Sequence, residues 1–371
     1  MTAPAQKHHS VFNIAVIVAA LGYFVDIYDL LLFTIVREPS LKGLGVDLTN
    51  TKEVIHASTM VINWQMWGLL IGGIIWGVMG DKKGRLSVLF GSIIIYSIAN
   101  FFTGFVQDVQ QYAYARFAAG IGLAGELGAG ITLVSELLPK NKRGIGTSLV
   151  AGIGLFGAVA AYFTFRLTDD WRLCYKIGAG LGVMLLFLRV SVAESGMFKQ
   201  VRESKVARGN FLMFFTNAKR FRKYALAILI GLPTWFVIGI LVNLSNRFAT
   251  AFYGGNNIES GRAIMYAYSA IAVGDILVGF VSQYFKSRKK ALYLFYFFAI
   301  VSGIYFFSGN IRNDASMYIA CAMLGFSTGF WAIFVTMGAE QFGTNLRATA
   351  ATTIPNMVRG SLPLINLMFV N

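Results

Sequence analysis

Apolar residues run along the chain in long blocks that short polar segments separate. Each block has about 20 residues or more, and at about 1.5 Å per helical residue this length crosses the roughly 30 Å hydrocarbon core of a bilayer. In the first part of the chain the blocks fall near 12–36, 57–79, 86–106, 110–138, 144–166 and 173–193. Five more fall near 224–246, 262–285, 290–308, 315–341 and 349–370. The pattern predicts an all-α integral membrane protein with eleven membrane-spanning helices.

The composition agrees with a chain that lies mostly in the membrane. Of its 371 residues, 56% are hydrophobic and only 13% are charged, and the mean hydropathy is +0.62. A water-soluble domain uses less apolar side chain than this. The first block is also too long for a secretory signal and has no small-residue cleavage pattern, so we interpret it as a retained first span.

The formal net charge of +15 resides mainly in alternate breaks between the blocks. Cytoplasmic loops of membrane proteins retain an excess of lysine and arginine, so we expect the N-terminus and the basic central segment to face the cytoplasm. The basic breaks hold Lys82, Lys83 and Arg85, then Lys140, Lys142 and Arg143, then the segment from Lys199 to Lys223, then Lys286, Arg288, Lys289 and Lys290. This distribution indicates contact with membrane lipid and no nucleic-acid partner.

Candidate catalytic and metal-binding groups are scarce. Cys174 and Cys321 lie in separate apolar blocks, which gives neither a metal-ligand spacing nor a disulfide framework. The three histidines, His8, His9 and His56, lie at or outside the block ends, and no nucleophile stands beside a base. We therefore expect no metal, no cofactor and no enzymatic activity.

Two pairs of segments repeat at nearly the same offset. "GVMGDKKGR" from Gly77 aligns with "GFVSQYFKSR" from Gly279, and "ELLPKNKRG" from Glu136 aligns with "EQFGTNLRA" from Glu340. The offsets are 202 and 204 residues. Six spans separate the copies, so the repeats have the same orientation in the membrane. We expect an N-terminal six-helix bundle at 1–194, a cytoplasmic central loop at 195–223 and a C-terminal bundle at 224–371.

Several segments resemble one protein family. "GVMGDKKGRLSVL" is similar to the signature loop between the second and third spans of the major facilitator superfamily. "DIYDLLLF", "YARFAAGIGLAGELGAGITLVSELLPKNKRG" and "AESGMF" resemble its metabolite:proton symporter branch. The resemblance implies the major facilitator fold of two pseudo-symmetric six-helix bundles. It also implies twelve spans, so we expect that a twelfth would follow Asn371, and whether the chain end there is natural or truncated stays open.

The signature loop has the composition of a conformational latch. Its acid would pair with an arginine or with a helix N-terminus across the two halves in one conformational state. The second copy has Gln283 where the first has Asp81, so the two loops need not hold the conformation equally well. The candidate latch residues are Gly80, Asp81, Gly84, Arg85, Glu136, Arg143, Glu340 and Arg347.

Three acids inside the spans are candidate proton-coupling residues. Asp26 and Asp29 are three residues apart and share one helix face, and neighbouring carboxylates disfavour double ionisation. Either could therefore bind a proton, or Asp29 could simply pair with a nearby arginine. Glu126 lies deeper in the fourth span and fits a buried hydrogen-bonded role or a second proton site.

The intramembrane arginines are candidate substrate-binding residues. Arg116 could approach a first-span carboxylate or the substrate, with a structural salt bridge as the alternative. Arg359 is flanked by prolines and Gly360, which predicts a bent helix, and its fork suits a substrate carboxylate. The alternative for Arg359 is an internal pair with Asp275. Arg189 lies near a span end, where its side chain could extend to the interface.

Three further residues are candidates for the cavity lining, although amide and aromatic residues pack between helices equally often. These are Asn63, Gln65 and Trp235.

Together the features predict a monomeric, multi-pass transporter of a bacterial inner membrane, coupling proton entry to a small organic anion by alternating access. A uniporter or symporter of a neutral sugar or osmolyte, and a membrane sensor that does not transport, are the alternatives. The substrate, the stoichiometry and the choice between the two aspartates stay open.

Overall fold

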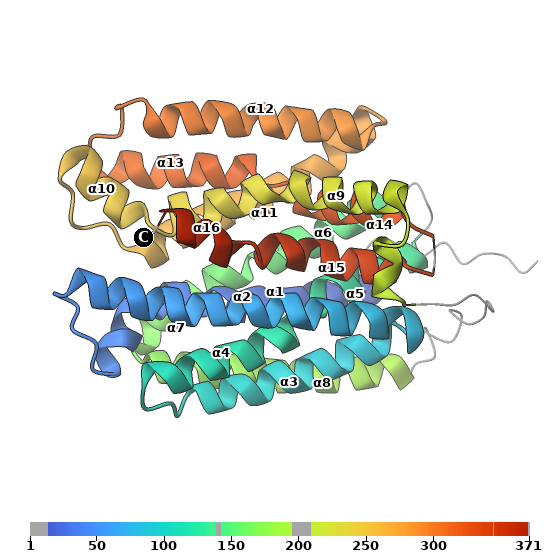
Figure 1. Cartoon of the computed structure of the whole chain (residues 1–371), viewed down its shortest axis with the longest axis horizontal. Coiled ribbons are helices and arrows are strands. Elements are labelled where there is room, and N and C mark those ends of the chain that lie inside the picture. The colour runs from blue at the N-terminus through green and yellow to red at the C-terminus, as the bar shows by residue number, and fades with distance from the viewer. Residues whose placement is uncertain (1–13, 139–141, 195–208, 344, 370–371) are drawn as a thin grey trace, which may run out of the picture.

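The computed structural model describes residues 14–138, 142–194, 209–343 and 345–369, except for the side chains of residues 15, 136 and 191–194. All regular structure in these ranges is helical. The long helices lie side by side along the longest axis of the molecule (Figure 1). The blue-to-green first half lies mostly below the yellow-to-red second half in this view.

The first half builds six spans from eight helices. Two predicted spans are each interrupted: 110–138 at Ala124 and Gly125, and 144–166 at Phe156. The helices are α1 Ile14–Gly43, α2 Thr51–Lys82, α3 Arg85–Thr103, α4 Val109–Leu123, α5 Glu126–Leu137, α6 Arg143–Leu155, α7 Gly157–Thr168 and α8 Trp171–Glu194.

The second half shows the same kind of interruption. The predicted span 224–246 is replaced by an earlier start at Ala218 and by a π-helical segment, and 315–341 is interrupted at Thr328–Phe330. The helices are η1 Phe211–Phe214 (3-10), α9 Ala218–Phe236, η2 Val237–Val242 (π), α10 Ser245–Tyr253, α11 Ser260–Tyr284, α12 Arg288–Phe307, α13 Asp314–Ser327, α14 Trp331–Glu340, α15 Arg347–Arg359 and α16 Leu362–Phe369.

Ten helical stretches of the described chain are long and apolar enough to cross a membrane, against eleven predicted. The difference is the last predicted span, 349–370, which divides into α15 and α16 at Gly360 and Ser361. This break agrees with the bend expected around Arg359. Of the predicted central loop 195–223, residues 195–208 lie outside the described residues, and its end already forms η1 and the first turn of α9.

The interruptions within the spans fall at equivalent places in the two halves. Phe156 and Gly360 are 204 residues apart, as are Ala124 and Thr328, and 204 is also the offset of the sequence repeat. Interrupted helices at corresponding positions of a repeat are typical of transporters, because the free helix ends line the central site.

Two equivalent contacts hold the halves together, α2 against α15 and α6 against α11. In each, the second span of one half packs on the fifth span of the other. Glycine allows the close approach of α2: a Cβ at Gly73 would lie 2.8 Å from Asn356 Cβ, and one at Gly77 would lie 3.1 Å from Thr349 Cα. The two halves therefore meet along small residues, as helices in membranes commonly do.

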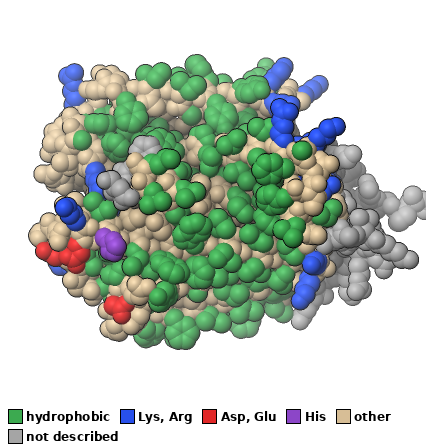
Figure 2. Space-filling model, in the orientation of Figure 1, with side chains coloured by type: hydrophobic (Ala, Val, Ile, Leu, Met, Phe, Trp, Pro, Cys, Tyr) green, Lys and Arg blue, Asp and Glu red, His purple; other side chains and the backbone are tan. Residues whose placement is uncertain are grey.

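The outer surface has a broad apolar band with charges at its ends. Large hydrophobic side chains such as Phe102, Phe187 and Ile304 are more than half exposed, and Figure 2 shows hydrophobic side chains over the middle of the molecule. Lysine and arginine gather mainly at one end of this view. Antiparallel α1 and α2 place Arg37 and Asp81 at opposite ends of the bundle. We call these the Arg37 end and the Asp81 end.

Candidate functional site

Asp29 and Arg116 form a buried ion pair inside the first half. Arg116 Nη1 lies 3.1 Å from Asp29 Oδ1, and Nη2 donates to the Asp29 carbonyl at 3.0 Å. Gln65 Oε1 and Asn100 Oδ1 accept further bonds from the guanidinium at 3.2 and 2.7 Å. Its carbon also lies 5.2 Å from the centre of the Tyr175 ring. Four groups of the first half thus engage the predicted substrate arginine, and Gln65 belongs to this network rather than to a cavity.

Asp26, one turn from Asp29 on α1, has no such partner. Its side chain is fully buried, and neither carboxylate oxygen has a hydrogen-bond partner in the described part of the chain. The charged groups that act on it are Arg359, Glu126, Asp29 and Arg189. The two aspartates predicted to share a face therefore have different surroundings. One is held in an ion pair, and the other is an unpaired carboxyl group among several charges.

Glu126 begins α5 at the break in the fourth span and forms a two-bond ion pair with Arg189. Arg189 Nη1 donates to Glu126 Oε2 at 3.0 Å, Nη2 contacts Oε1, and Nη1 also donates to the Leu89 carbonyl at 2.9 Å. Both side chains are buried. The expectation that Arg189 extends to the interface is wrong, because its partner lies inside the bundle.

Arg359 ends α15 at the break before α16, in the interior between the halves. The centres of the Trp235 and Trp331 rings lie 6.0 and 5.8 Å from its guanidinium carbon. Tyr23 of α1 accepts a long hydrogen bond of 3.5 Å from Nη2. Within the described residues, no carboxylate lies within 4 Å of this arginine.

The alternative pair between Arg359 and Asp275 does not form. Asp275 Oδ1 instead accepts from the backbone N–H of Ala332 at 3.1 Å, at the start of α14. A carboxylate at a helix N-terminus satisfies a free N–H group and interacts favourably with the helix dipole. The contact with α14 explains why Asp275 is buried. No such partner among the described residues explains the buried charge of Arg359.

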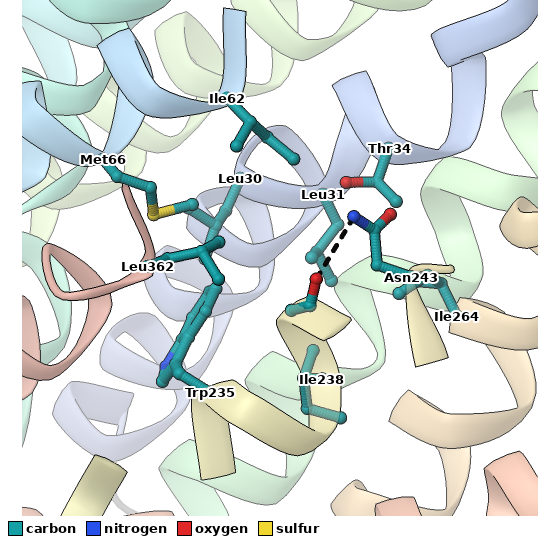
Figure 3. Close-up of a pocket in the computed structure, with 11 residues that line it drawn as sticks. Leu30, Leu31, Thr34, Ile62, Met66, Trp235, Ile238, Asn243, Ile264 and Leu362 are labelled. Carbon is teal, nitrogen blue, oxygen red and sulfur yellow. Dashed lines mark hydrogen bonds between the residues drawn. The ribbon is translucent and has the colours of Figure 1, made fainter. Parts of the chain in front are cut away.

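A small cavity lies between the halves beside Trp235 (Figure 3). Its volume is about 20 Å³, enough for about one water molecule but not for a metabolite. Its lining is apolar apart from two polar side chains and one glycine, and comprises Leu30, Leu31, Thr34, Ile62, Met66, Trp235, Ile238, Gly239, Asn243, Ile264 and Leu362. Asn63 does not line it but accepts a 3.0 Å hydrogen bond from Asn366, so it joins α2 to α16.

The cavity continues toward the Arg37 end. A second cleft of about 60 Å³ shares Ile62, Gly239 and Asn243 with it. Arg37 of α1 closes this route: its Nη2 donates to Ser260 Oγ at 2.9 Å and its Nη1 to Asn243 Oδ1 at 3.4 Å. Arg37 was not among the candidates predicted from the sequence, because its partners are more than 200 positions away.

Asp81 makes the corresponding contact at its own end of the bundle. Its carboxylate accepts from the backbone N–H groups of Ala348 and Thr349 at 3.1 and 2.8 Å and from the Thr349 hydroxyl at 2.6 Å. The sequence predicted that Asp81 would pair with an arginine or with a helix N-terminus of the other half. The partner in the other half is the N-terminus of α15. Arg85 lies 3.6 Å from Asp81 and donates to the Gly80 carbonyl. Gly84, at φ +94°, allows the turn between α2 and α3.

The remaining candidate latch residues gather nearby. Arg143, Glu340 and Arg347 line one small cleft between the halves. Glu340 pairs with Arg288, and Arg143 donates to the Leu138 carbonyl at 3.0 Å. The side chain of Glu136 lies outside the described residues. In the part of the chain that the structure describes, the two halves are in contact at both ends and the cavity beside Trp235 is water-sized, so we call this arrangement closed.

Comparison with known proteins identifies the family to which this fold belongs. The profile described as Major Facilitator Superfamily matches residues 11–363. A protein of Haemophilus influenzae that carries the provisional name of metabolite transport protein is 27% identical over 360 residues, covering 93% of this chain and 85% of that protein. The sialic acid transporter NanX of Escherichia coli is 23% identical, covering 91% and 82%.

A solved structure has the same arrangement of helices. The proton:xylose symporter XylE, bound to 6-bromo-6-deoxy-D-glucose, superposes with a TM-score of 0.72 at 15% identity and covers 97% of this chain and 89% of that one. The family and these relatives are transporters, not enzymes. The chain therefore belongs to the Major Facilitator Superfamily and is a multi-pass membrane transporter of metabolites.

Proposed function

We propose that the protein is a symporter that moves a small organic anion together with a proton. The observation that carries this proposal is the buried Arg359 in the interior between the halves, which no carboxylate of the described residues approaches within 4 Å. A buried arginine requires a compensating anion, and its planar fork matches a carboxylate. The substrate would supply the direct carboxylate partner that Arg359 lacks among the described residues.

Asp26 is the proposed proton site. Tyr23, which contacts Arg359, lies one turn from Asp26 on the same face of α1. An ionised Asp26 would partly balance the charge of Arg359, whereas a bound substrate anion would repel it. Substrate binding therefore favours a protonated Asp26, and each ligand increases the affinity for the other. The unpartnered oxygens of Asp26 in the closed structure agree with a role other than a permanent ion pair.

The two end contacts would serve alternating access. We propose that the halves, 1–194 and 224–371, rock about the central site, so that either the Asp81 contacts or the Arg37 contacts are broken at one time. The basic breaks surround the Asp81 end, which supports a cytoplasmic position for that end and for the N-terminus. The Arg37 end would then face outward.

Proton movement in proteoliposomes tests this function. A trapped pH-sensitive dye reports internal acidification after addition of benzoate, glucuronate or xylose, with protein-free liposomes as the baseline. We expect an organic anion, and not xylose, to accelerate acidification. Asp26→Asn should abolish this acceleration yet retain exchange of labelled anion across the membrane. Arg359→Gln should weaken anion binding about tenfold to a hundredfold, because it removes charge-assisted hydrogen bonds of about 1.5–3 kcal/mol each.

Matched controls separate these effects from general damage. Asp47→Asn and Arg312→Gln change an exposed acid and an exposed arginine outside the spans. Hydrogen bonds from the Thr49 side chain and backbone hold the pKa of Asp47 below its usual value, so it stays ionised over the assay range. Acidification that persists in Asp26→Asn would exclude Asp26 as the proton site. Acidification by xylose alone would favour the neutral-sugar alternative, and binding without translocation would favour a sensor.

A further inference from the structure

We infer that the transported anion is a monocarboxylate with an apolar body, of the aryl or branched-alkyl type, rather than a hydroxyl-rich acid. This inference rests on the proposed function and specifies its substrate class. It follows from the surfaces that surround the central cavity, which differ sharply between the end at Arg359 and the rest of the lining.

Every helix that forms the cavity places at least one large apolar side chain in the lining. Leu30 and Leu31 come from α1, Ile62 and Met66 from α2, Ile264 from α11 and Leu362 from α16. Trp235 and Ile238 complete the wall from α9 and η2, and Figure 3 shows Trp235 lying against Leu362. A hydroxyl group buried against such a wall loses its hydrogen bonds to water, at about 1–3 kcal/mol each. A sugar-like body carries several of these groups.

Only two of the lining side chains are polar, and one of them already has hydrogen-bond partners within the protein. Asn243 accepts from Arg37 and donates to the Gly239 carbonyl at 3.4 Å, the contact dashed in Figure 3. Thr34 is the other. A polyhydroxylated molecule would therefore find fewer partners than it needs.

The charged end of the ligand has a defined position. Arg359 ends α15 three residues before Leu362, which begins α16, and it lies beside Trp235, so it stands at one end of the apolar wall. Two buried donors there, Arg359 Nε and Trp331 Nε1, have no hydrogen-bond partner in the described part of the chain. Buried donors without partners are rare in native structures. A single carboxylate, with two acceptor oxygens, would satisfy both donors while its apolar body lies against Trp235.

A binding experiment on the full chain in detergent tests this class. We would measure the shift in unfolding temperature over a concentration series of benzoate, its neutral analogue benzamide, the hydroxyl-rich acid glucuronate, and xylose. Benzoate should stabilise the protein at concentrations at least about tenfold lower than glucuronate, as apolar pockets discriminate by this order. Benzamide should be weak because it lacks the charge. Arg359→Gln should abolish the effect of benzoate.

A second variant tests the apolar wall directly. Met66→Gln keeps the shape of the side chain but places an amide in the cavity, and should weaken benzoate about tenfold while leaving or improving glucuronate. Met60→Gln, on the same helix and outside the lining, is the matched control.

The outcomes separate this inference from the proposed function. Arg359-dependent binding of glucuronate equal to or tighter than that of benzoate overturns the apolar class but leaves anion transport intact. Stabilisation by xylose alone overturns both. Stabilisation by none of the four compounds also overturns the inference, since the folded protein should bind benzoate if the class is correct.

Discussion

At the scale of single residues, four charged groups inside the spans have different surroundings. Asp29 and Glu126 each have a buried arginine partner, whereas among the described residues Asp26 has no hydrogen-bond partner and Arg359 has no carboxylate within 4 Å. An ion pair that stays intact contributes no net charge to the core. We therefore propose that coupling involves Asp26 and Arg359, and that Asp29 and Arg116 have a structural role.

The structural role of this pair predicts a specific pattern of stability. Asp29→Asn or Arg116→Gln alone leaves one buried charge uncompensated and should lower the free energy of unfolding by about 3–5 kcal/mol. The double variant removes both charges and should be destabilised by clearly less than the sum. Unfolding of the unchanged protein, the two single variants and the double variant in detergent, followed by intrinsic fluorescence, measures the coupling energy between Asp29 and Arg116. Additive losses would show that the pair does not act as a unit.

At the scale of elements, each end of the bundle is closed by a contact to a helix of special geometry. Asp81 holds the N-terminus of α15, whereas Arg37 reaches Asn243, the residue directly after the π-helical η2. π-Helical turns are strained and are frequent at functional sites. We therefore expect the seventh span to bend at η2 when the Arg37 contacts break.

Removal of the Arg37 contacts should open that end selectively. Arg37→Ala in a protein that carries Thr34→Cys, a position in the closed cavity, should label faster with a polar maleimide. The native Cys174 and Cys321 are buried and give a low background. Arg247→Ala, in the adjoining cleft, is the matched control. An unchanged labelling rate in Arg37→Ala would mean that Arg37 does not hold this end closed.

Removal of the Asp81 contacts should have the opposite effect. Asp81→Ala takes away three hydrogen bonds to α15 and the charge at its N-terminus. It should therefore raise the labelling rate of Ser135→Cys, in the cleft at the Asp81 end, and leave that of Thr34→Cys unchanged or lower. If Asp81→Ala accelerated both positions equally, it would have loosened the whole bundle rather than one end.

At the scale of the whole molecule, the sequence predicted most spans, because long apolar runs and basic breaks are local properties. The interruptions at Phe156 and Thr328 were not predicted, since they depend on packing. Gly157, for instance, lies so close to α1 that a Cβ there would be 2.0 Å from the Phe24 carbonyl oxygen. The partners of Arg189 and Arg37, 63 and 223 positions away, likewise required the tertiary structure.

The proposed roles of Asp26 and Arg359 predict the electrical behaviour of the whole transport cycle. An empty carrier holds an ionised Asp26 with Arg359, and a loaded carrier holds a protonated Asp26 with Arg359 and the monoanion, so this pair of sites has no net charge in either state. One proton and one monocarboxylate also sum to zero. Transport of benzoate should therefore generate no current on a solid-supported membrane, and passive entry of the neutral acid adds none.

Asp26→Asn changes this balance, because its empty carrier keeps the positive charge of Arg359 while its loaded carrier is neutral. Net transport by this variant should then produce current and respond to membrane potential, up to about 50-fold for 100 mV, since one elementary charge corresponds to about 2.3 kcal/mol. Asp47→Asn, which alters a charge outside the spans, should generate no current, like the unchanged protein. A benzoate-dependent current in the unchanged protein would require a different number of protons per anion and would contradict this account of the two sites.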